Sequence, residues 1–579
     1  MKDKLKKIIR SSIKESALIE EDLINTFEIE INQSTQSDHG DFSSNIALKI
    51  SGKANIKPLK VAEIISRTIE RPKWLTKIEV APPGFINFFV DDRTKADLLT
   101  SILEQENNYG SFPTNSEDSI LLEFVSSNPT GPLHVGHGRH AAYGDSLAKI
   151  LRKAGHTVSC EYYINDSGRQ IDILVLSVLL ALINKKESLL TVPAACYQGS
   201  YISNLTEVIP KQAIAEINKL SIPGLKVKEA DEDREADALI SIIKDSVGES
   251  IFEEVTASGV DKMIKIIKSD LSSFGVEFDH WFSEKTMINH SKIDMALKKL
   301  KTKKALFNKD GATWLNTTAY GDDKDRVVLR DDGRSTYFAS DIAYHADKKE
   351  RGFDKLINIL GSDHHGYINR LKGGLASMDY NPEDLEIVLM QFVTLYRGKK
   401  KVQMSTRSGE FIPMRELYEE VGIDAARFIY VSRSYDQHLD FDLELAKEQS
   451  NLNPVYYIQY ANARICSVMK EIEKKGYKND HDLGIKNIGS LDSKHESELI
   501  TMLQKYPDII KTSAEQRAVN KLSNYLKDIA QLFHSYYGKQ KFVIDEDETR
   551  NARVILLRSV SIVIKDGLSL LGVSAPSKM

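Results

Sequence analysis

The sequence predicts an α/β fold in which a Rossmann-like parallel sheet is flanked by an N-terminal α+β unit and a C-terminal all-α bundle. A strand–loop–helix–strand pattern over 120–164 predicts the sheet. An amphipathic opening helix and an apolar run at 84–90 predict the N-terminal unit, and helical periodicity with few Gly or Pro after 453 predicts the bundle. A chain of 579 residues should divide in this way, because single cores rarely grow past about 250 to 300 residues.

The same patterns predict domain boundaries. We expect an N-terminal domain over 1–110, a Rossmann-like domain over 117–380, a connecting segment over 381–452 and a helical domain over 453–579. Charged, helical sequence from about 171 to 279 predicts an insertion between the two halves of the sheet. The second half should resume near Val327.

Four consecutive segments make up a βαβ unit. They are a buried strand at 120–125, a loop at 126–133, a helix from Gly138 and a second strand at 157–164. Gly155 stands where the helix would end in a left-handed cap. The ligand of such a unit lies beyond the carboxyl end of the first strand, so the loop and the helix N-terminus form the predicted site.

Further strands are predicted downstream. Val327–Arg330 and Ser335–Phe338 flank an Asp-Gly turn and predict a hairpin. Leu356–Leu360 is a continuous apolar run, followed by the polar run Gly361–His365. We expect this apolar run to be another strand of the same sheet, with polar groups at its carboxyl end.

His134 and His137 stand at the predicted helix start, with Gly136 between them. A helix N-terminus presents unpaired N–H groups and a partial positive charge, which favour phosphate. Two imidazoles there can donate hydrogen bonds to a phosphate as negative charge builds, and a glycine leaves room for a nucleotide against the backbone. Such a short motif also fits two surface histidines near a turn, but its βαβ setting favours a phosphate site.

Composition restricts the class of protein. The hydrophobic fraction of 41%, without an apolar stretch near the roughly 20 residues of a membrane span, predicts no membrane association. A secretory signal is not evident, so we expect a cytoplasmic protein. Cys160, Cys196 and Cys466 are far apart and odd in number, which argues against a structural metal. With a net charge of -5, nucleic-acid binding would need local basic patches.

Aromatic and basic side chains are interleaved near the end of the predicted bundle. Because this combination stacks bases and holds phosphates, we take five residues as candidates for RNA contact: Tyr456, Phe533, Tyr536, Tyr537 and Lys539. An aromatic stripe at helical spacing also fits a packed core, so both interpretations stay open for each ring.

The segment Asn128–His137, Asn-Pro-Thr-Gly-Pro-Leu-His-Val-Gly-His, resembles the first signature of class I aminoacyl-tRNA synthetases in the form used by arginyl-tRNA synthetases. Further segments resemble that family in the same order: 163–170, 197–201, 278–281, 337–344, 361–366 and 424–428. The resemblance covers nearly the whole chain, including an N-terminal tRNA-elbow domain and a C-terminal helical anticodon-binding domain. It implies that the Rossmann-like domain is the catalytic domain.

The resemblance also implies a reaction and its partners. L-arginine and ATP would give arginyl-adenylate and pyrophosphate, and the arginyl group would then pass to the terminal ribose of tRNA(Arg). Family members generally need tRNA before they activate arginine. We expect Mg²⁺ to accompany ATP, no metal site on the protein itself, and a monomer.

Five residues are implied in binding arginine. Glu123 and Asn128 align with residues that hold its ammonium and carboxylate groups, and His134 lies close to both substrates. Tyr337 and Asp341 resemble the pair that receives the guanidinium group. A carboxylate binds a planar guanidinium through paired charge-assisted hydrogen bonds, and a ring can cover its face. A core ring and a helix cap are the alternative roles of this pair.

ATP contacts are implied in the same way. The candidates are Pro132, Gly136, Gly361, Asp363, His364, Met404 and Ser405. Some relatives carry Gln near the position of His364 or His365, so the substrate that each contacts is open; we assign His365 to arginine.

The second class I signature is altered here. Gln403–Arg407 stands where the family pattern is Lys-Met-Ser-Lys-Ser, so both lysines are missing. The loop before His134 also lacks the lysine that some arginyl enzymes place there. One cation on a mobile loop can neutralise the charge of pyrophosphate, and the nearest candidates are Lys399, Lys400, Lys401 and Arg407. We take Lys401 and Arg407 as catalytic, with His134 and His137.

Two alternatives stay open at this point. A class I synthetase for another amino acid is one; cysteinyl enzymes hold their substrate on zinc, and no cysteine cluster exists here. A relative that binds tRNA without catalysis is the other, since the second signature is altered. A small adenylyltransferase would not need the large C-terminal bundle.

Overall fold

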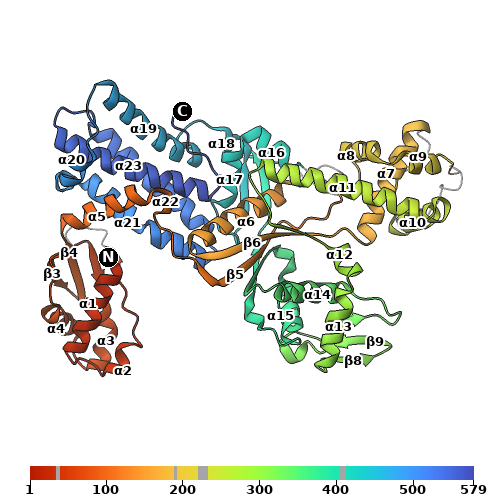
Figure 1. Cartoon of the computed structure of the whole chain (residues 1–579), viewed down its shortest axis with the longest axis horizontal. Coiled ribbons are helices and arrows are strands. Elements are labelled where there is room, and N and C mark those ends of the chain that lie inside the picture. Colours follow the sequence, from red (N-terminus) through yellow and green to blue (C-terminus); the bar gives the residue numbers. More distant parts are fainter. Residues whose placement is uncertain (34–39, 188–191, 220–231, 403–411) are drawn as a thin grey trace.

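A computed structural model gives the fold for residues 1–33, 40–187, 192–219, 232–402 and 412–579. The predicted fold class is confirmed: the chain has a central parallel sheet, an N-terminal α+β domain and a C-terminal helical bundle. Figure 1 shows these parts along an elongated molecule, with the helical segment after β6 at the end opposite the bundle.

The central sheet has the order β12-β11-β5-β6-β7, and every neighbouring pair is parallel. Its strands are β5 (Asn115–Glu123), β6 (His156–Ile164), β7 (His280–Ser283), β11 (Lys355–Gly361) and β12 (Leu385–Met390). Helix α6 (Val135–Lys153) connects β5 to β6 and ends before Gly155, whose φ of 95° is left-handed as predicted. The predicted βαβ unit and the strand at 356–360 are thus confirmed.

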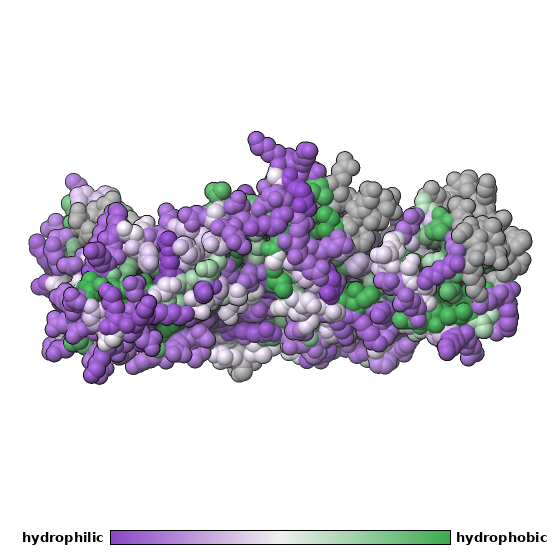
Figure 2. All heavy atoms as spheres, turned by 90° about the horizontal axis from the view of Figure 1, so that it is seen from above, coloured by the Kyte–Doolittle hydropathy of each residue, from purple (hydrophilic) through white to green (hydrophobic). Residues whose placement is uncertain are grey.

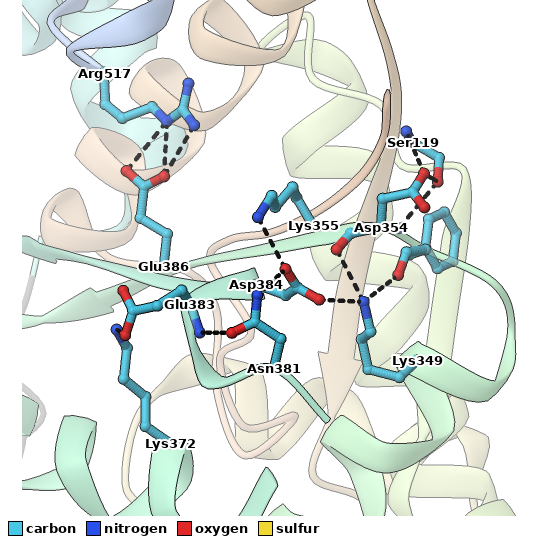
Figure 3. A network of polar contacts seen from close by, with 11 residues as sticks. Ser119, Lys349, Asp354, Lys355, Lys372, Asn381, Glu383, Asp384, Glu386 and Arg517 are labelled. Carbon is cyan, nitrogen blue, oxygen red and sulfur yellow. Dashed lines mark hydrogen bonds and ion pairs between the residues drawn. The ribbon is translucent and has the colours of Figure 1, made fainter. Parts of the chain in front are cut away.

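Ion pairs join the amino ends of the strands, away from the predicted site (Figure 3). Asp384, just before β12, accepts hydrogen bonds from Lys349 at 3.0 Å and from Lys355 at 2.9 Å. Glu386 of β12 pairs with Arg517 of the bundle at 2.9 Å. These contacts fix the registers of β11 and β12 and join the sheet to the bundle.

A helical segment lies between β6 and β7, as the charged sequence predicted. Its helices are α7 (Arg169–Glu187), α8 (Ser200–Leu205), α9 (Lys211–Ile217), α10 (Glu232–Val247) and α11 (Glu249–Ser273). Buried aliphatic residues of α7, among them Leu176 and Leu179, pack with Leu239 and Met263 of α10 and α11 in a core of their own.

The prediction for 327–338 is partly wrong. The sheet resumes at β7, and the strand at 327 belongs to a separate antiparallel sheet, β10-β9-β8. The second predicted arm is reduced to a single bridge between Ser335 and Leu329, beside which the Thr336 N–H donates to the Val328 carbonyl at 3.0 Å. The arm ends there because the Thr336 hydroxyl accepts a hydrogen bond from the Ala339 N–H and caps a helix that begins at Tyr337.

The chain between β7 and β12 packs mainly against the face of the central sheet opposite α6. Its elements are α12 (Glu284–Asn289), α13 (Lys292–Thr302), β8 (Leu306–Lys309), β9 (Ala312–Leu315), β10 (Arg326–Leu329), α14 (Tyr337–Glu350), the 3₁₀ helix η6 (Ser362–Tyr367) and α15 (Ile368–Ala376). Helix α14 carries the predicted Tyr337 and Asp341, and η6 follows the carboxyl end of β11.

The C-terminal residues are helical, as predicted. Connecting elements come first: β13 (Val393–Arg397), β14 (Lys400–Lys401), α16 (Met414–Val421), α17 (Ile423–Val431), β15 (Leu439–Asp442) and α18 (Leu443–Lys447). The bundle consists of α19 (Pro454–Lys474), α20 (His481–Lys486), α21 (Lys494–Glu515), α22 (Val519–Lys539) and α23 (Asp547–Leu570). It shares one hydrophobic core with α6, and the fully buried Arg427 joins the two by bonding the Leu571 carbonyl and pairing with Asp145.

The N-terminal domain has its own core around Phe42 and Phe88. Its elements are α1 (Lys2–Glu15), α2 (Glu21–Ile24), β1 (Asn32–Gln33), β2 (Phe42–Ser44), α3 (Ile46–Ala54), α4 (Pro58–Thr68), β3 (Leu75–Ala81) and β4 (Phe85–Val90). Helix α5 (Asp92–Gln105) follows, and its Leu99 and Ile102 pack in the core shared with the bundle.

The surface is mostly hydrophilic on the face seen in Figure 2, where hydrophobic residues lie in separate patches. Among the described residues, no helix is both long enough and apolar enough to span a membrane.

Candidate active site

The N-terminus of α6 holds the two motif histidines in a reciprocal cap. The helix begins at Val135, three residues earlier than predicted, because His134 acts as its N-cap. The backbone N–H of Gly136 donates to His134 Nδ1 at 3.0 Å, and the backbone N–H of His134 donates to His137 Nδ1 at 3.2 Å. The two rings stack with their centroids 3.7 Å apart.

These hydrogen bonds define the protonation of both rings. Each Nδ1 accepts from an N–H group, so a neutral ring carries its proton on Nε2. Burial lowers the pKa of His134, and burial together with the nearby His134 and His140 lowers the pKa of His137 well below its usual range. Both imidazoles are therefore neutral N–H donors at neutral pH.

Gly136 makes room for the capping histidine. A Cβ atom on this residue would lie 2.9 Å from Cε1 and 3.1 Å from Nδ1 of the His134 ring. A side chain here would therefore displace the His134 ring, and the predicted contact of Gly136 with a nucleotide stays a prediction.

The residues that follow the second signature lie beside these histidines. The N–H of Val135 donates to the Ile412 carbonyl at 3.3 Å, and that of Met414 donates to the Leu133 carbonyl at 2.7 Å. Before the signature, Lys399 and the two β14 residues, Lys400 and Lys401, are all exposed. The candidates Met404, Ser405 and Arg407 lie outside the described residues.

Glu123 stands at the carboxyl end of β5, where the chain turns sharply. Val125 and Ser126 have φ values of 68° and 41°, a left-handed region that costs a β-branched residue on the order of 1–3 kcal/mol. The Ser126 hydroxyl donates to Glu123 Oε1 at 3.0 Å, and the buried Lys348 pairs with Oε2. Strain and bonding together hold this carboxylate, only 6% exposed, at the edge of the predicted site.

Asp341 lies in the second turn of α14, beside η6. The Tyr367 hydroxyl donates to Asp341 Oδ2 at 2.5 Å. Burial raises the pKa of Asp341 to about 7, with Glu123 and Glu284 adding to the rise and Tyr367 and Arg370 opposing it. Glu123 and Asp341, far apart in sequence, therefore border one acidic region.

Glu284 belongs to the same acidic region, and the sequence analysis missed it. It opens α12 directly after β7 and is 6% exposed. The Ser167 hydroxyl donates to Glu284 Oε2 at 3.0 Å, and burial raises the pKa of this carboxyl. Its position gave only a weak signal: Glu284 follows the carboxyl end of a parallel strand, as the polar run after Leu360 does, but that strand, β7, is only four residues long.

Tyr337 opens α14 and is 69% exposed, which rules out the alternative of a core ring. Its hydroxyl would lie 4.0 Å from a Cβ atom on Gly168 in the loop after β6. This exposure leaves the ring accessible to a ligand that enters the acidic region.

The loop before α6 contacts two of the other motifs. Asn128 Nδ2 donates to Gln170 Oε1 at 2.5 Å, and the Tyr201 hydroxyl donates to the Thr130 carbonyl at 3.1 Å. Tyr201 also lies against Gly131, next to the half-buried Pro132. The structure thus brings the 163–170 and 197–201 segments to the predicted site.

The polar run after β11 is mostly exposed. A Cβ atom on Gly361 would lie 2.4 Å from Asp363 Oδ1, so only glycine lets the Asp363 side chain fold back. His364 lies 3.9 Å from Asp363. His365 lines a cavity of about 610 Å³ with Asp322 and Arg370, and no described contact brings it to Glu123.

The bundle candidates divide into two groups. Phe533 and Tyr536 are 0% and 1% exposed, and the Tyr536 hydroxyl donates to Glu496 at 2.6 Å. Predicting RNA contact for these two rings was therefore wrong; they are core residues, because they lie on the inner face of α22. Tyr456 and Tyr537 are half-buried, and Lys539 is exposed.

An aromatic cluster, which the sequence analysis only partly identified, connects α19 to α22. The Tyr456 ring stacks on the Tyr460 ring with their centroids 6.0 Å apart, and the centroid of the His534 ring lies 5.9 Å from that of Tyr460. The Arg464 guanidinium lies 4.3 Å from the Tyr460 ring and 4.8 Å from the Tyr537 ring. We call Tyr456, Tyr460, Arg464, His534 and Tyr537 the aromatic cluster; all five are half-buried.

Comparison with protein families decides the identity of the chain. The family model described as the catalytic domain of class I tRNA synthetases (R) matches residues 98–465. The arginyl tRNA synthetase N-terminal domain matches 3–90, and the DALR anticodon binding domain matches 458–579. The chain belongs to the arginyl-tRNA synthetase family. It is accordingly an enzyme that forms aminoacyl-tRNA, an arginine–tRNA ligase.

Curated relatives of this arginyl-tRNA synthetase agree over almost the full length. The Arginine–tRNA ligase of Hydrogenovibrio crunogenus is 45% identical over 95% of both chains. That of Coxiella burnetii is 44% identical, covering 95% of this chain and 94% of the relative. The solved structure of Thermus thermophilus arginyl-tRNA synthetase matches with a TM-score of 0.76 over 100% of both chains at 20% identity, which supports the fold.

Proposed function

We propose that the chain forms arginyl-adenylate at the junction of β5, α6 and α14 and then transfers the arginyl group to tRNA(Arg). The carboxylate oxygen of arginine attacks the α-phosphorus of ATP, and pyrophosphate leaves. A ribose hydroxyl of the tRNA then attacks the arginyl carbonyl carbon, its proton is lost, and AMP leaves. One observation carries this proposal: three carboxylates border one region beside a helix N-terminus that holds two neutral N–H donors.

The acidic region would hold the two positive groups of arginine. We assign the α-ammonium to Glu123 with Asn128, and the guanidinium to Asp341 and Glu284, with the exposed Tyr337 ring over its face. A guanidinium has five N–H donors in a fixed plane, so carboxylates can pair with it where lysine would leave acceptors unpaired. His365 stays a weaker candidate for arginine, because its described neighbours lie around another cavity.

The histidines would act on the phosphates of ATP. Their Nε2–H groups, with the partial positive charge of the α6 N-terminus, can stabilise negative charge on the α-phosphate as pyrophosphate leaves. Pro132, Gly361, Asp363, His364, Met404 and Ser405 would contact the nucleotide, with Mg²⁺ entering on ATP. Gly136 would support ATP binding indirectly, by letting His134 cap the helix.

A cation for the departing pyrophosphate would come from the second-signature loop. Lys401 and Arg407 are our candidates, together with Lys399 and Lys400. The exposed Lys401 lies two residues before the signature, and Ile412 and Met414, which follow it, contact the residues on either side of His134. A cation there could neutralise charge on the departing pyrophosphate.

The aromatic cluster would contact tRNA(Arg) through Tyr456, Tyr537 and their neighbours, with Lys539 binding phosphate. Half-buried rings beside a guanidinium can stack unpaired bases on the part of the ring that solvent reaches. We further propose that the enzyme acts as a cytoplasmic monomer.

Pyrophosphate exchange tests the proposal. We expect arginine-dependent exchange only when tRNA(Arg) is present. Robust exchange without tRNA would contradict tRNA-dependent activation, and absence of exchange under both conditions would contradict catalysis and leave the alternative of a non-catalytic tRNA-binding protein.

A further inference from the structure

Helix α14 presents a row of polar side chains to the central sheet. Asp341, Tyr344, His345 and Lys348 are spaced as i, i+3, i+4 and i+7, which places them on one face. Tyr344 and His345 are each 4% exposed, and Lys348 is 0% exposed. A helix that packs on a parallel sheet ordinarily buries apolar residues on this face, so the polar row calls for a specific reason.

The row is part of a continuous hydrogen-bonded network. Lys348 Nζ donates to Glu123 Oε2 and, at 3.1 Å, to Asn358 Oδ1 on β11. Asn358 Nδ2 then bonds His345 Nε2 at 2.9 Å, and His345 Nδ1 bonds the Asp341 carbonyl at 2.7 Å. A lysine ammonium can only donate, so Asn358 Oδ1 accepts from Lys348. The Asn358 Nδ2–H therefore donates to His345 Nε2, and the His345 Nδ1–H donates to the Asp341 carbonyl.

Charge gives Lys348 a second role. Glu123, Glu284 and Asp341 all interact within one region, and neighbouring carboxylates disfavour each other's charged forms. In the described contacts, Lys348 is the only ammonium group that reaches Glu123, and its other close neighbours are Asn358 Oδ1 at 3.1 Å and the Tyr344 ring at 4.2 Å. Removing this ammonium would leave a buried carboxylate without its cation, which is strongly unfavourable.

We propose that Lys348 is a positioning residue for arginine recognition. It pairs with the Glu123 carboxylate and holds it oriented toward the α-ammonium of the substrate, and through Asn358 and His345 it connects this end of the site to the backbone carbonyl of Asp341. The inference rests on the proposed role of Glu123. It predicts that Lys348 affects recognition of the α-amino group, although it touches no substrate.

The test uses an arginine analogue that lacks the α-amino group, 5-guanidinopentanoic acid. The ratio of its inhibition constant to the arginine KM, both from aminoacylation, measures recognition of the ammonium. Lys348→Met should lower this ratio on the order of tenfold or more, since a hydrogen bond to a charged group is lost. In Lys348→Met, the KM for ATP should change less than about twofold. Lys348→Arg keeps the cation, so its ratio should stay close to the wild-type value.

Lys349 supplies a matched control on the same helix. Its ammonium is also mostly buried and also pairs with a carboxylate, Asp384, but at the amino ends of the strands (Figure 3). Lys349→Met should therefore lower stability without changing the ratio. Equal losses of the ratio in Lys348→Met and Lys349→Met would show a general structural effect and overturn the inference.

Variants of Glu123 separate the inference from the proposal beneath it. If Glu123→Gln leaves the ratio unchanged, the role of Glu123 is wrong and the inference falls with it. If Glu123→Gln lowers the ratio but Lys348→Met does not, the inference alone is overturned.

A double variant keeps the test open should Lys348→Met fail to fold. Glu123→Gln with Lys348→Met removes both charges of this ion pair, so neither partner is left as an unpaired buried charge. If Lys348 acts through Glu123, the double variant should have the same ratio as Glu123→Gln within about twofold. A further tenfold loss in the double variant would overturn the inference.

Discussion

The Tyr367 hydroxyl donates a 2.5 Å hydrogen bond to Asp341 Oδ2, joining η6 to α14 at the acidic region. The pKa of Asp341 is raised to about 7, mainly by burial, so the carboxyl is ionised above pH 7 and protonated below it. Because only the ionised form pairs with a guanidinium, the KM for arginine should rise about tenfold for each pH unit below 7. A constant KM for arginine between pH 6 and 8, measured by aminoacylation, would contradict this prediction.

Two variants control the pH measurement. Tyr367→Phe removes a donor that lowers the Asp341 pKa, so the midpoint should move to higher pH. Asp341→Ala should raise the arginine KM far more than the ATP KM and abolish the pH dependence. An unchanged arginine KM in Asp341→Ala would remove Asp341 from the site.

His137 should contribute to adenylate formation as a neutral donor. His137→Ala should lower its rate about 10²- to 10³-fold with little effect on the KM for arginine, since one donor to a developing charge is lost. The exposed His290 is a matched control, and His290→Ala should retain full activity. Single-turnover measurement of adenylate with tRNA present distinguishes the two, and equal rates for both variants would refute the role of His137.

Gly136→Ala should displace the His134 ring. The added Cβ would lie 2.9 Å from the ring, so the cap at the start of α6 must shift. We expect adenylate formation to fall at least about tenfold, as expected when a catalytic donor is displaced. Gly259 in α11 has no atom within 4 Å of an added Cβ, and Gly259→Ala should keep wild-type activity. Full activity in Gly136→Ala would show that the histidine cap is dispensable.

Arg464→Ala should weaken tRNA binding. The guanidinium orders two rings of the aromatic cluster, and loss of one base-stacking contact costs about 1–3 kcal/mol, so the Kd should rise about tenfold. Filter binding measures it, with the exposed Lys470 on the same helix changed to Ala as the control. If the Arg464 and Lys470 variants bind tRNA equally well, the cluster does not contact tRNA.

One of the four cations around the second signature, Lys399, Lys400, Lys401 and Arg407, should be needed for adenylate formation. Replacing the residue that neutralises pyrophosphate with alanine should slow adenylate formation about 10²-fold, if its charge acts only in the transition state. Rapid-quench assays on the four variants identify it. Full turnover in all four would place the cation elsewhere in the chain.

Much of the site could be predicted because parallel strands obey simple rules. His134 was found from the βαβ pattern and the polar run after Leu360 from a further apolar strand, since strand ends meet at one edge. Glu123 was assigned from the family resemblance. Glu284 obeys the same rule, but β7 is only four residues long and gives too weak a periodic signal to be recognised.

Burial within the bundle could not be predicted in the same way. Phe533 and Tyr537 lie four residues apart on α22, yet one is in the core and the other is half-buried, because the neighbouring helices decide which face is covered. The role of Lys348 was also hidden, since a lysine in a helix ordinarily faces solvent. Its partners, Glu123 on β5 and Asn358 on β11, are far apart in the sequence, and only the folded sheet brings them together.

Aminoacylation of a total tRNA pool with each of the twenty amino acids in turn is the most decisive measurement. With ATP and Mg²⁺ present, arginine alone should be attached, and only to tRNA(Arg). Attachment of another amino acid at a comparable rate, or of none, would contradict the assignment of the acidic region to arginine.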